Sequence, residues 1–170
     1  MRVHTHQAET LVEIHNAFLL ASKFLRIGLV MQIERLMVKN VITVQIDASA
    51  YDAVKLMNKS RIGCLVAVYN DKIVGILTER DLLERVLEKC KNPKETTVAE
   101  IMTRQVIVGK PDMQLIEATR LMFENKVKKL PIAKGNQLVG LVTLTDIARA
   151  TSVDTKTIEL IEKLSNMHMI

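Results

Sequence analysis

The chain has 170 residues, 48% hydrophobic and 25% charged, which is enough for one sizeable core or two packed halves of an ordinary globular protein. Three Phe, two Tyr and no Trp offer few aromatic faces for stacking bases, which argues against a single-stranded nucleic-acid platform. Solvated lysines explain the net charge of +5 more simply than a polyanionic partner does. The two cysteines, Cys64 and Cys90, have no close spacing, and no export signal is evident. These features predict a reducing, cytoplasmic location and no metal cluster.

Residues 1–30 have the pattern of an amphipathic helical segment, with the helix over 8–30. Apolar residues recur there at helical spacing, and charged residues fill the positions between them. Lys23 and Arg26 interrupt the most apolar part, so this segment is not expected to span a membrane. No small-residue cleavage site of a signal peptide follows it. The sequence leaves open whether the chain starts at Met1 or at Met31.

Residues 31–90 predict a β-α-β-β-α unit. A linker at 91–97 follows it, and Asn92-Pro93 in this linker ends the last helix of the unit. β-branched runs, a tight turn and a capping box mark its elements. The elements expected are a strand at 41–44, a helix opened by Ser49 and Asp52, strands at 65–68 and 73–77, and a closing helix over 78–90.

The same order returns 65 residues later, over residues 98–150. The elements expected are a turn opened by Thr97 and Glu100, a strand at 106–108, a helix around 117–125, and strands at 130–132 and 138–142. Pro131 predicts an edge strand or a bulge. Residues 151–170 predict a C-terminal helix with an apolar face over 154–164. One unit used twice indicates an α/β fold, or α+β by stricter usage, in which two small mixed sheets pack between four helices.

One trio of polar and small residues recurs within the repeat: Gly75, Thr78 and Asp81 return as Gly140, Thr143 and Asp146. Thr and Asp at this spacing form a capping box, and for a single copy capping alone is the simpler interpretation. Two copies in register, each where a strand ends and a helix begins, favour a ligand as well. A helix N-terminus offers N–H groups to phosphate, and a carboxylate there can accept both ribose hydroxyls.

A second candidate group is basic. Lys128 and Lys129 precede a strand in the second repeat, where the first repeat has the uncharged Gly63 and Cys64. Arg61 matches Lys126 at the same offset, and both fit a phosphate contact or an ordinary solvated surface equally. The sequence has no phosphate loop, Gly-rich dinucleotide turn or nucleophile–base pair, so we expect no catalysis. Histidines at positions 4 and 6 lie too near the terminus to predict a metal site.

Together these features resemble the tandem cystathionine β-synthase (CBS) domain pair, also called the Bateman module. The resemblance covers about residues 33–150. It rests on the two Gly/Thr/Asp endings, on Lys-Lys-Leu-Pro-Ile at 128–132 and on Arg-Ile-Gly-Cys-Leu-Val at 61–66. It implies two repeats related by a pseudo-twofold axis, flanked by the N- and C-terminal helices. It also implies two clefts that bind adenosine-containing ligands.

The resemblance implies further that both repeats contribute to each cleft. The first set of lining residues is Ile42, Ile62, Lys128, Lys129, Leu141, Thr143 and Asp146. The second set is Arg61, Gly63, Ile76, Thr78, Asp81, Ile107 and Val127. In each cleft the Asp is expected at the ribose, the Thr at the phosphate and the residue after the glycine at the base. Because Gly63 supplies no side chain where the family often has a polar residue, we expect the Asp146 cleft to bind more tightly.

The sequence thus predicts a regulatory sensor of AMP, ADP, ATP or another adenosyl ligand, with no cofactor and no catalysis. Ligand would bridge the repeats and shift their relative orientation through differential affinity. The apolar faces of the flanking helices predict a homodimer and offer surfaces to a regulated protein partner. Two alternatives remain open at this point. One is a ligand-free dimerisation or interaction module in which Thr and Asp only cap helices, and the other is a nucleic-acid-binding accessory protein.

Overall fold

The computed structural model describes residues 31–151. Its elements are η1 (Ile33–Arg35), β1 (Thr43–Gln45), α2 (Ala50–Ser60), β2 (Cys64–Tyr69), β3 (Lys72–Thr78), α3 (Glu79–Leu82), η2 (Leu83–Leu87), α4 (Val98–Ile101), α5 (Leu115–Glu124), β4 (Lys129–Lys134), β5 (Gln137–Thr143) and α6 (Leu144–Thr151). This mixed architecture confirms the predicted α+β class, but the strands form one five-stranded sheet and not the two small sheets expected, because β3 pairs with β5. The amphipathic helices predicted over 8–30 and 154–164 lie outside the described residues.

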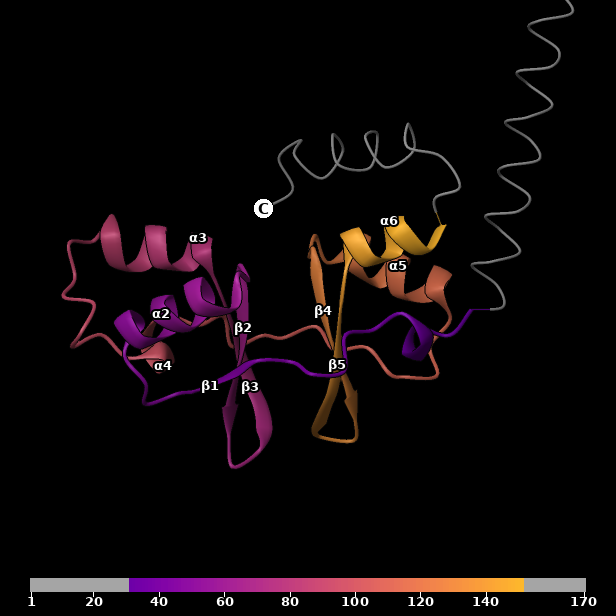
Figure 1. The fold of residues 1–170 in the computed structure, drawn as a ribbon, viewed down its shortest axis with the longest axis horizontal. Coiled ribbons are helices and arrows are strands. Elements are labelled where there is room, and N and C mark those ends of the chain that lie inside the picture. The colour runs from indigo at the N-terminus through magenta and orange to yellow at the C-terminus, as the bar shows by residue number, and fades with distance from the viewer. Residues whose placement is uncertain (1–30, 152–170) are drawn as a thin grey trace, which may run out of the picture.

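Two antiparallel hairpins form the centre of the molecule. β2 pairs with β3 and β4 pairs with β5, while β1 joins β2 in parallel. Among the named strands, the two hairpins are joined by one pair of residues, Lys72 of β3 with Gln137 of β5. The sheet order is therefore β1-β2-β3-β5-β4. Helices cover the outer side of each hairpin (Figure 1). Residues 72 and 137 are equivalent at the 65-residue offset, so their pairing places them beside the pseudo-twofold axis.

Local sequence determines where several helices begin and end. The Ser49 hydroxyl caps α2 by accepting a hydrogen bond from Asp52 N at 3.1 Å, as predicted. At α4, Thr97 N donates to the Glu100 carboxylate at 3.1 Å. Arg61, the residue that ends α2, has a left-handed backbone with φ 52°. Lys126 has φ 53° just beyond α5. The matched basic pair therefore shares a backbone role in terminating helices.

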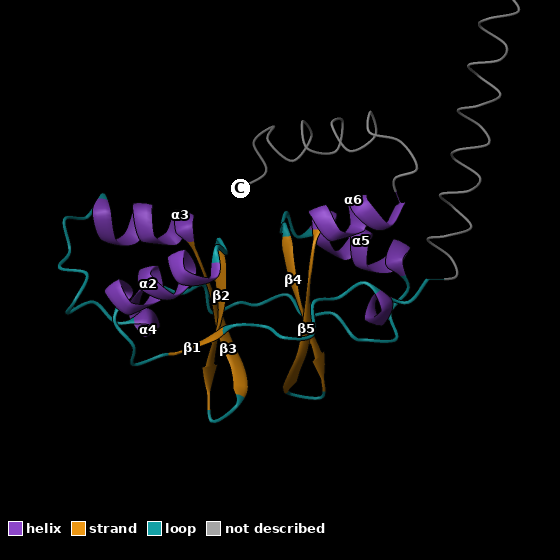
Figure 2. Cartoon of the chain, in the orientation of Figure 1, coloured by secondary structure: helices purple, strands orange, loops and turns teal. Residues whose placement is uncertain are grey.

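Each half of the molecule contains a segment that belongs in sequence to the other repeat. Ile33 and Met37 pack in the core of the second half, whereas Val98, Ile101 and Met102 pack in the core of the first. We call residues 33–42 and 98–107 the crossing segments, because the chain then runs on into the opposite half (Figure 2). The two halves are thus joined by exchanged apolar contacts as well as by the strand pair.

The repeated glycines are the positions where the crossing segments pack. A Cβ atom at Gly75 would collide with the Met102 side chain, and one at Gly140 would collide with Met37. Both glycines and both methionines recur at the 65-residue offset, so each repeat accommodates the other in the same way. The glycine of the trio is explained by this close approach, without a ligand.

The predicted strand at 106–108 is wrong. Gly109 alone pairs there, by donating to Pro131 O at 2.9 Å and accepting from Ala133 N at 3.0 Å. In the first repeat the parallel ladder extends one residue further at each end, to Gln45 beside Val68 and to Thr43 beside Val66. Pro131 stands where Val66 stands and has no N–H to donate, so the ladder stops before Val108. Pro131 does lie in an edge strand, as predicted.

The predicted closing helix over 78–90 is only partly continuous. α3 ends at Leu82, and η2 continues it as a π-helix to Leu87. Glu88 N accordingly donates to Leu83 O, five residues back, at 2.8 Å. The wider turn contains Arg85, a residue that is important at the candidate site.

Candidate functional site

The Thr143–Asp146 motif forms the first turn of α6, directly after β5. Thr143 N and Thr143 Oγ1 donate to Asp146 Oδ2 at 2.9 Å and 2.7 Å. Asp146 N donates back to Thr143 Oγ1 at 3.2 Å. Asp146 is partly exposed. Within residues 31–151, no group forms a hydrogen bond or ion pair with its second oxygen, Oδ1.

The Thr78–Asp81 motif has the same capping geometry and a different outcome. Thr78 N and Thr78 Oγ1 donate to Asp81 Oδ2 at 2.7 Å and 2.6 Å, and Asp81 N donates back at 3.3 Å. Here the second oxygen, Oδ1, also has a partner, because Arg85 Nη2 lies 3.0 Å away. The Asp81 side chain is only 10% exposed.

Arg85 was not identified from the sequence. Its guanidinium also donates to Ile101 O at 2.7 Å and to Thr103 Oγ1 at 3.1 Å. A signal was present, since Arg85 follows Asp81 by four residues, a spacing at which opposite charges meet on a helix. The equivalent position of the second repeat is Ala150.

The capping interpretation therefore holds in both repeats. Each threonine hydroxyl already donates to its own aspartate, so a phosphate would have to replace that bond to receive a proton from it. The two motifs differ in the carboxylate oxygen that does not take part in capping. Asp146 keeps one carboxylate oxygen that has no bonded group in the described part of the chain, and Asp81 does not.

The structure brings the predicted base-contacting residues beside the crossing segments. Leu141 exchanges two backbone hydrogen bonds with Val38, at 2.9 Å and 3.0 Å, and Ile76 does the same with Thr103. Ile42 follows Val38 along one segment, and Ile107 follows Thr103 along the other. Each strand that ends in a Thr/Asp motif is thus paired with the crossing segment that carries a predicted apolar residue of the other repeat.

The other apolar residues predicted to line the clefts pack against the core of the repeat to which they belong in sequence. Ile42 and Ile62 pack against the first core, and Ile107 and Val127 pack against the second. Gly63 is a close-packed position, since its O accepts from Glu79 N at 3.3 Å and a Cβ there would meet the Glu79 carboxylate. The exposed Arg61 forms no hydrogen bond or ion pair with Thr78 or Asp81 in the described structure.

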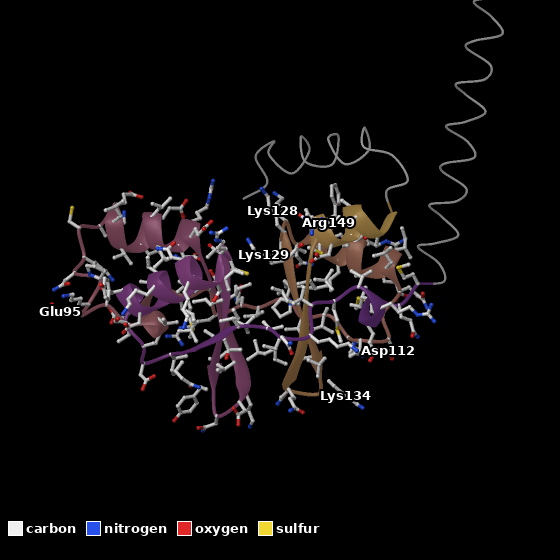
Figure 3. All side chains as sticks on the ribbon, in the orientation of Figure 1. Glu95, Asp112, Lys128, Lys129, Lys134 and Arg149 are labelled. Carbon is white, nitrogen blue, oxygen red and sulfur yellow. The ribbon has the colours of Figure 1, made fainter. Side chains whose placement is uncertain are left out.

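The two predicted lysines lie on the side of the second half that faces the first (Figure 3). Lys128 O accepts from Leu144 N at 3.1 Å, next to the Thr143 cap. Burial raises the pKa of the Cys64 thiol, the Lys129 ammonium opposes that rise, and Glu79 adds to it. Lys129 is therefore within electrostatic reach of Cys64 in the other half. These two residues are also 65 apart, so they occupy equivalent positions in the two repeats.

A separate pocket of about 260 Å³ opens near the first crossing segment. It is lined by Lys39, Val41, Thr43, Val68, Asp71, Gln137 and Leu138. None of the predicted ligand residues lines it. Its lining comes from the crossing segment, β1, β2, the turn of the first hairpin and the start of β5, and it contains no part of either Thr/Asp motif.

Two further properties concern the described residues alone. No helix in residues 31–151 is long and apolar enough to cross a membrane. Over the same residues, no three His, Cys, Asp or Glu side chains are grouped to hold a metal ion. His4 and His6 lie outside this range.

Two α+β repeats with exchanged segments and a helix-capping Thr/Asp motif in each define a tandem module of two intertwined domains. A family model for the CBS domain matches residues 33–88 and 98–153. The chain belongs to the CBS-domain family and carries a tandem pair of these domains.

Known proteins with this domain resemble the chain over most of the described region. It is 34% identical over 109 residues to the mitochondrial CBS domain-containing protein CBSX3 of Arabidopsis thaliana, covering 61% of the chain and 53% of the relative. It is 34% identical over 138 residues to inosine-5′-monophosphate dehydrogenase of Methanocaldococcus jannaschii, covering 80% of the chain and 27% of the relative. A conserved CBS-domain protein from Thermoplasma acidophilum is 29% identical with a TM-score of 0.68, over 79% of this chain and 75% of that one. The chain thus spans about half of the first relative and about a quarter of the second.

Proposed function

We propose that this CBS pair is a regulatory sensor that binds an adenosine nucleotide in the Asp146 cleft and performs no chemistry on it. The observation that carries the proposal is the Asp146 carboxylate at the start of the eight-residue α6. Thr143 holds one of its oxygens, and the other has no bonded group among the described residues. An oriented and partly exposed carboxylate of this kind can accept both hydroxyls of a ribose.

The surroundings of Asp146 support a complete nucleotide. Leu141 and the crossing segment that leads to Ile42 supply apolar surface for a base. Lys128 and Lys129 supply positive charge for phosphate on the side that faces the first half (Figure 3). A nucleotide is the ligand class that uses the carboxylate, the apolar wall and the basic residues together.

The connection between the halves supports a regulatory mechanism. The named strands of the two hairpins meet through one residue pair, and the crossing segments provide the other links. A ligand that touches Asp146 in one half and Ile42 or Ile62 in the other would bind one relative orientation of the halves more tightly. That difference in affinity is what would shift the population toward one orientation.

Thermal melting against AMP, ADP, ATP, an adenosyl thioether and GTP tests this proposal. At a hundredfold excess over the dissociation constant, a bound ligand stabilises the fold by about 2.7 kcal/mol. We expect adenosine ligands to raise the melting temperature of the native chain and to leave Asp146→Ala unshifted. Asp52→Ala is the matched control, because Asp52 also lies in a helix cap and has no proposed ligand role. If no nucleotide shifts the native chain, the proposal is wrong.

A second candidate, a protein-interaction or homodimerisation module, is favoured by exposed apolar side chains. Leu83, Leu87 and Phe123 are 58%, 70% and 71% exposed. Contiguous apolar patches are typical of surfaces that bury against another protein, and Leu83 and Leu87 lie four residues apart on η2. The same melting experiment separates the two functions. A module that only caps its helices would lose about 0.5–2 kcal/mol in Asp146→Ala and would respond to no nucleotide.

A further inference from the structure

The two Thr/Asp motifs of this chain are not equivalent. We infer that Arg85 closes the Asp81 cleft to ribose, so that each chain binds a single nucleotide, at Asp146. This inference rests on the proposed function of the Asp146 cleft. It adds the binding stoichiometry and the residue that sets it.

The first step is the state of the Asp81 carboxylate. Oδ2 accepts from Thr78 N and Thr78 Oγ1, and Oδ1 lies 3.0 Å from Arg85 Nη2. The side chain is 10% exposed, so it has little contact with water. A ribose hydroxyl would therefore have to displace a charged donor from a nearly buried acceptor. Guanidinium and carboxylate both carry charge, so their pairing is stronger than the hydrogen bond that an uncharged ribose hydroxyl would make to the same carboxylate.

The second step is how firmly Arg85 is held. Besides Asp81, its guanidinium bonds the backbone carbonyl of Ile101 and the hydroxyl of Thr103. Both belong to the crossing segment that packs into this half, and Thr103 is paired with Ile76 of β3. Arg85 thus spans from the Asp81 cap to the segment beside the predicted base position. Three acceptors from two parts of the chain orient one guanidinium.

The third step is the second repeat, where the same bonds cannot form. The position equivalent to Arg85 is Ala150, which has no donor. The counterpart of Thr103 is Val38, which has no hydroxyl, whereas the backbone carbonyl at Leu36 is present as at Ile101. This substitution of Ala for Arg is what leaves Asp146 Oδ1 without a bonded group among residues 31–151.

Isothermal titration with AMP and with ATP tests the inference on the full chain. The native protein is expected to bind one nucleotide per chain. Arg85→Ala should bind two, with the Asp81 cleft gaining about tenfold or more in affinity, since a partly buried ion pair no longer competes. Ala150→Arg, made in the otherwise native chain, should weaken nucleotide binding at Asp146 by about tenfold. An arginine at position 150 can bond the Asp146 carboxylate and the Leu36 carbonyl.

Two controls accompany these variants. Arg85→Met keeps the aliphatic stem while removing the guanidinium, so it replaces Arg85→Ala if alanine lowers stability. Arg80→Ala removes a neighbouring arginine whose 3.7 Å pairing with Glu84 is exposed, and it should leave the stoichiometry at one.

The outcomes separate the inference from the function on which it rests. One site in the native chain, two without the Arg85 guanidinium and a weakened site in Ala150→Arg support it. Two sites in the native chain, or one site in both Arg85 variants, overturn it and leave the sensor function intact. If AMP and ATP bind neither the native chain nor any variant, the sensor function and the inference fall together.

Discussion

Single residues at equivalent positions give the two repeats different properties. Asp81 and Asp146 occupy the same place in the same cap, yet only Asp81 is bonded by an arginine four residues later. Pro131 is a second example, because it takes the place of Val66 and stops the parallel ladder at Gly109. The two repeats share one backbone arrangement, so the differences in bonding and strand pairing between them come from individual residues.

Replacing Pro131 with valine should extend the parallel pairing from Gly109 to Val108. Valine has an N–H that can donate to the backbone of Ile107. Position 131 would then pair with Val108, as Val66 pairs with Thr43 in the first repeat. The proline is fully buried, and a swap of similar volume should change stability by less than about 1.5 kcal/mol. Amide hydrogen exchange measures the result, and the new amide at position 131 should exchange slowly. Rapid exchange there in a folded variant would contradict this explanation of the missing strand.

At the scale of elements, the crossing segments hold the two halves together. Each one places an apolar side chain against a glycine of the opposite hairpin, Met102 at Gly75 and Met37 at Gly140. The strand before each Thr/Asp motif therefore has its position set by a residue of the other repeat. Removing this close approach should weaken the connection between the halves.

A double-mutant cycle at Gly140 and Met37 checks this contact. Gly140→Ala should cost about 1–3 kcal/mol by overpacking. Met37→Ala should cost about 2–5 kcal/mol by leaving a cavity. The double variant should cost less than the sum by about 0.5–3 kcal/mol, because alanine at 37 relieves the collision. Chemical denaturation supplies all three values.

Gly135 provides the matched control for that cycle. No atom lies within 4 Å of a Cβ built there, and its backbone is left-handed with φ 62°. Gly135→Ala should therefore cost about 1–2 kcal/mol from the backbone alone. Its effect should add to that of Met37→Ala. Equal coupling of Met37 to both glycines would show that the methionine contact is not specific.

At the scale of the whole molecule, equivalent residues meet along the pseudo-twofold axis. Lys72 pairs with Gln137 at the hairpin turns, and Cys64 lies within electrostatic reach of Lys129 at the first residues of β2 and β4. A residue on such an axis lies opposite the equivalent residue of the other repeat. Where the two repeats differ in sequence, as at Lys72 and Gln137, two different side chains face each other there. The buried Cys64 thiol therefore reports on the junction between the halves.

The reactivity of Cys64 toward a disulfide reagent tests this arrangement across pH. Burial raises its pKa above the ordinary value of 9.0, so it should react more slowly than the exposed Cys90. Glu79→Gln removes a charge that raises the pKa and should speed the reaction. Lys129→Met removes a charge that lowers it and should slow the reaction. The opposite order would contradict an electrostatic interaction between Lys129 and Cys64.

The same pKa shift has a consequence for stability, with a definite sign. The folded state binds the thiol proton more tightly than the unfolded state does. Its contribution is therefore fully present below pH 9 and is lost as the pH rises from there through the folded pKa. Denaturation of Cys64→Ala against the native chain should show this decline only in the native chain.

Much of the fold was predictable because its signals are local. The repeat, the cap at Ser49 and the edge position of Pro131 each depend on residues within a few positions of one another, or on an apolar pattern that recurs at a fixed offset. The strand at 106–108 was predicted wrongly because its β-branched residues have the right propensity and lack a donor in the neighbouring strand. Propensity describes one segment, whereas a strand requires a partner.

The candidate site divides in the same way. The sequence by itself determined two Thr/Asp caps, their place between strand and helix, and the asymmetry of the lysines, because capping is a hydrogen bond between residues three apart. Only the tertiary structure showed that the glycines accommodate methionines of the other repeat and that Arg85 bonds Asp81 together with Ile101 and Thr103. Apart from the Arg85–Asp81 pair, those contacts join residues 16 to more than 100 positions apart, and packing alone brings them together.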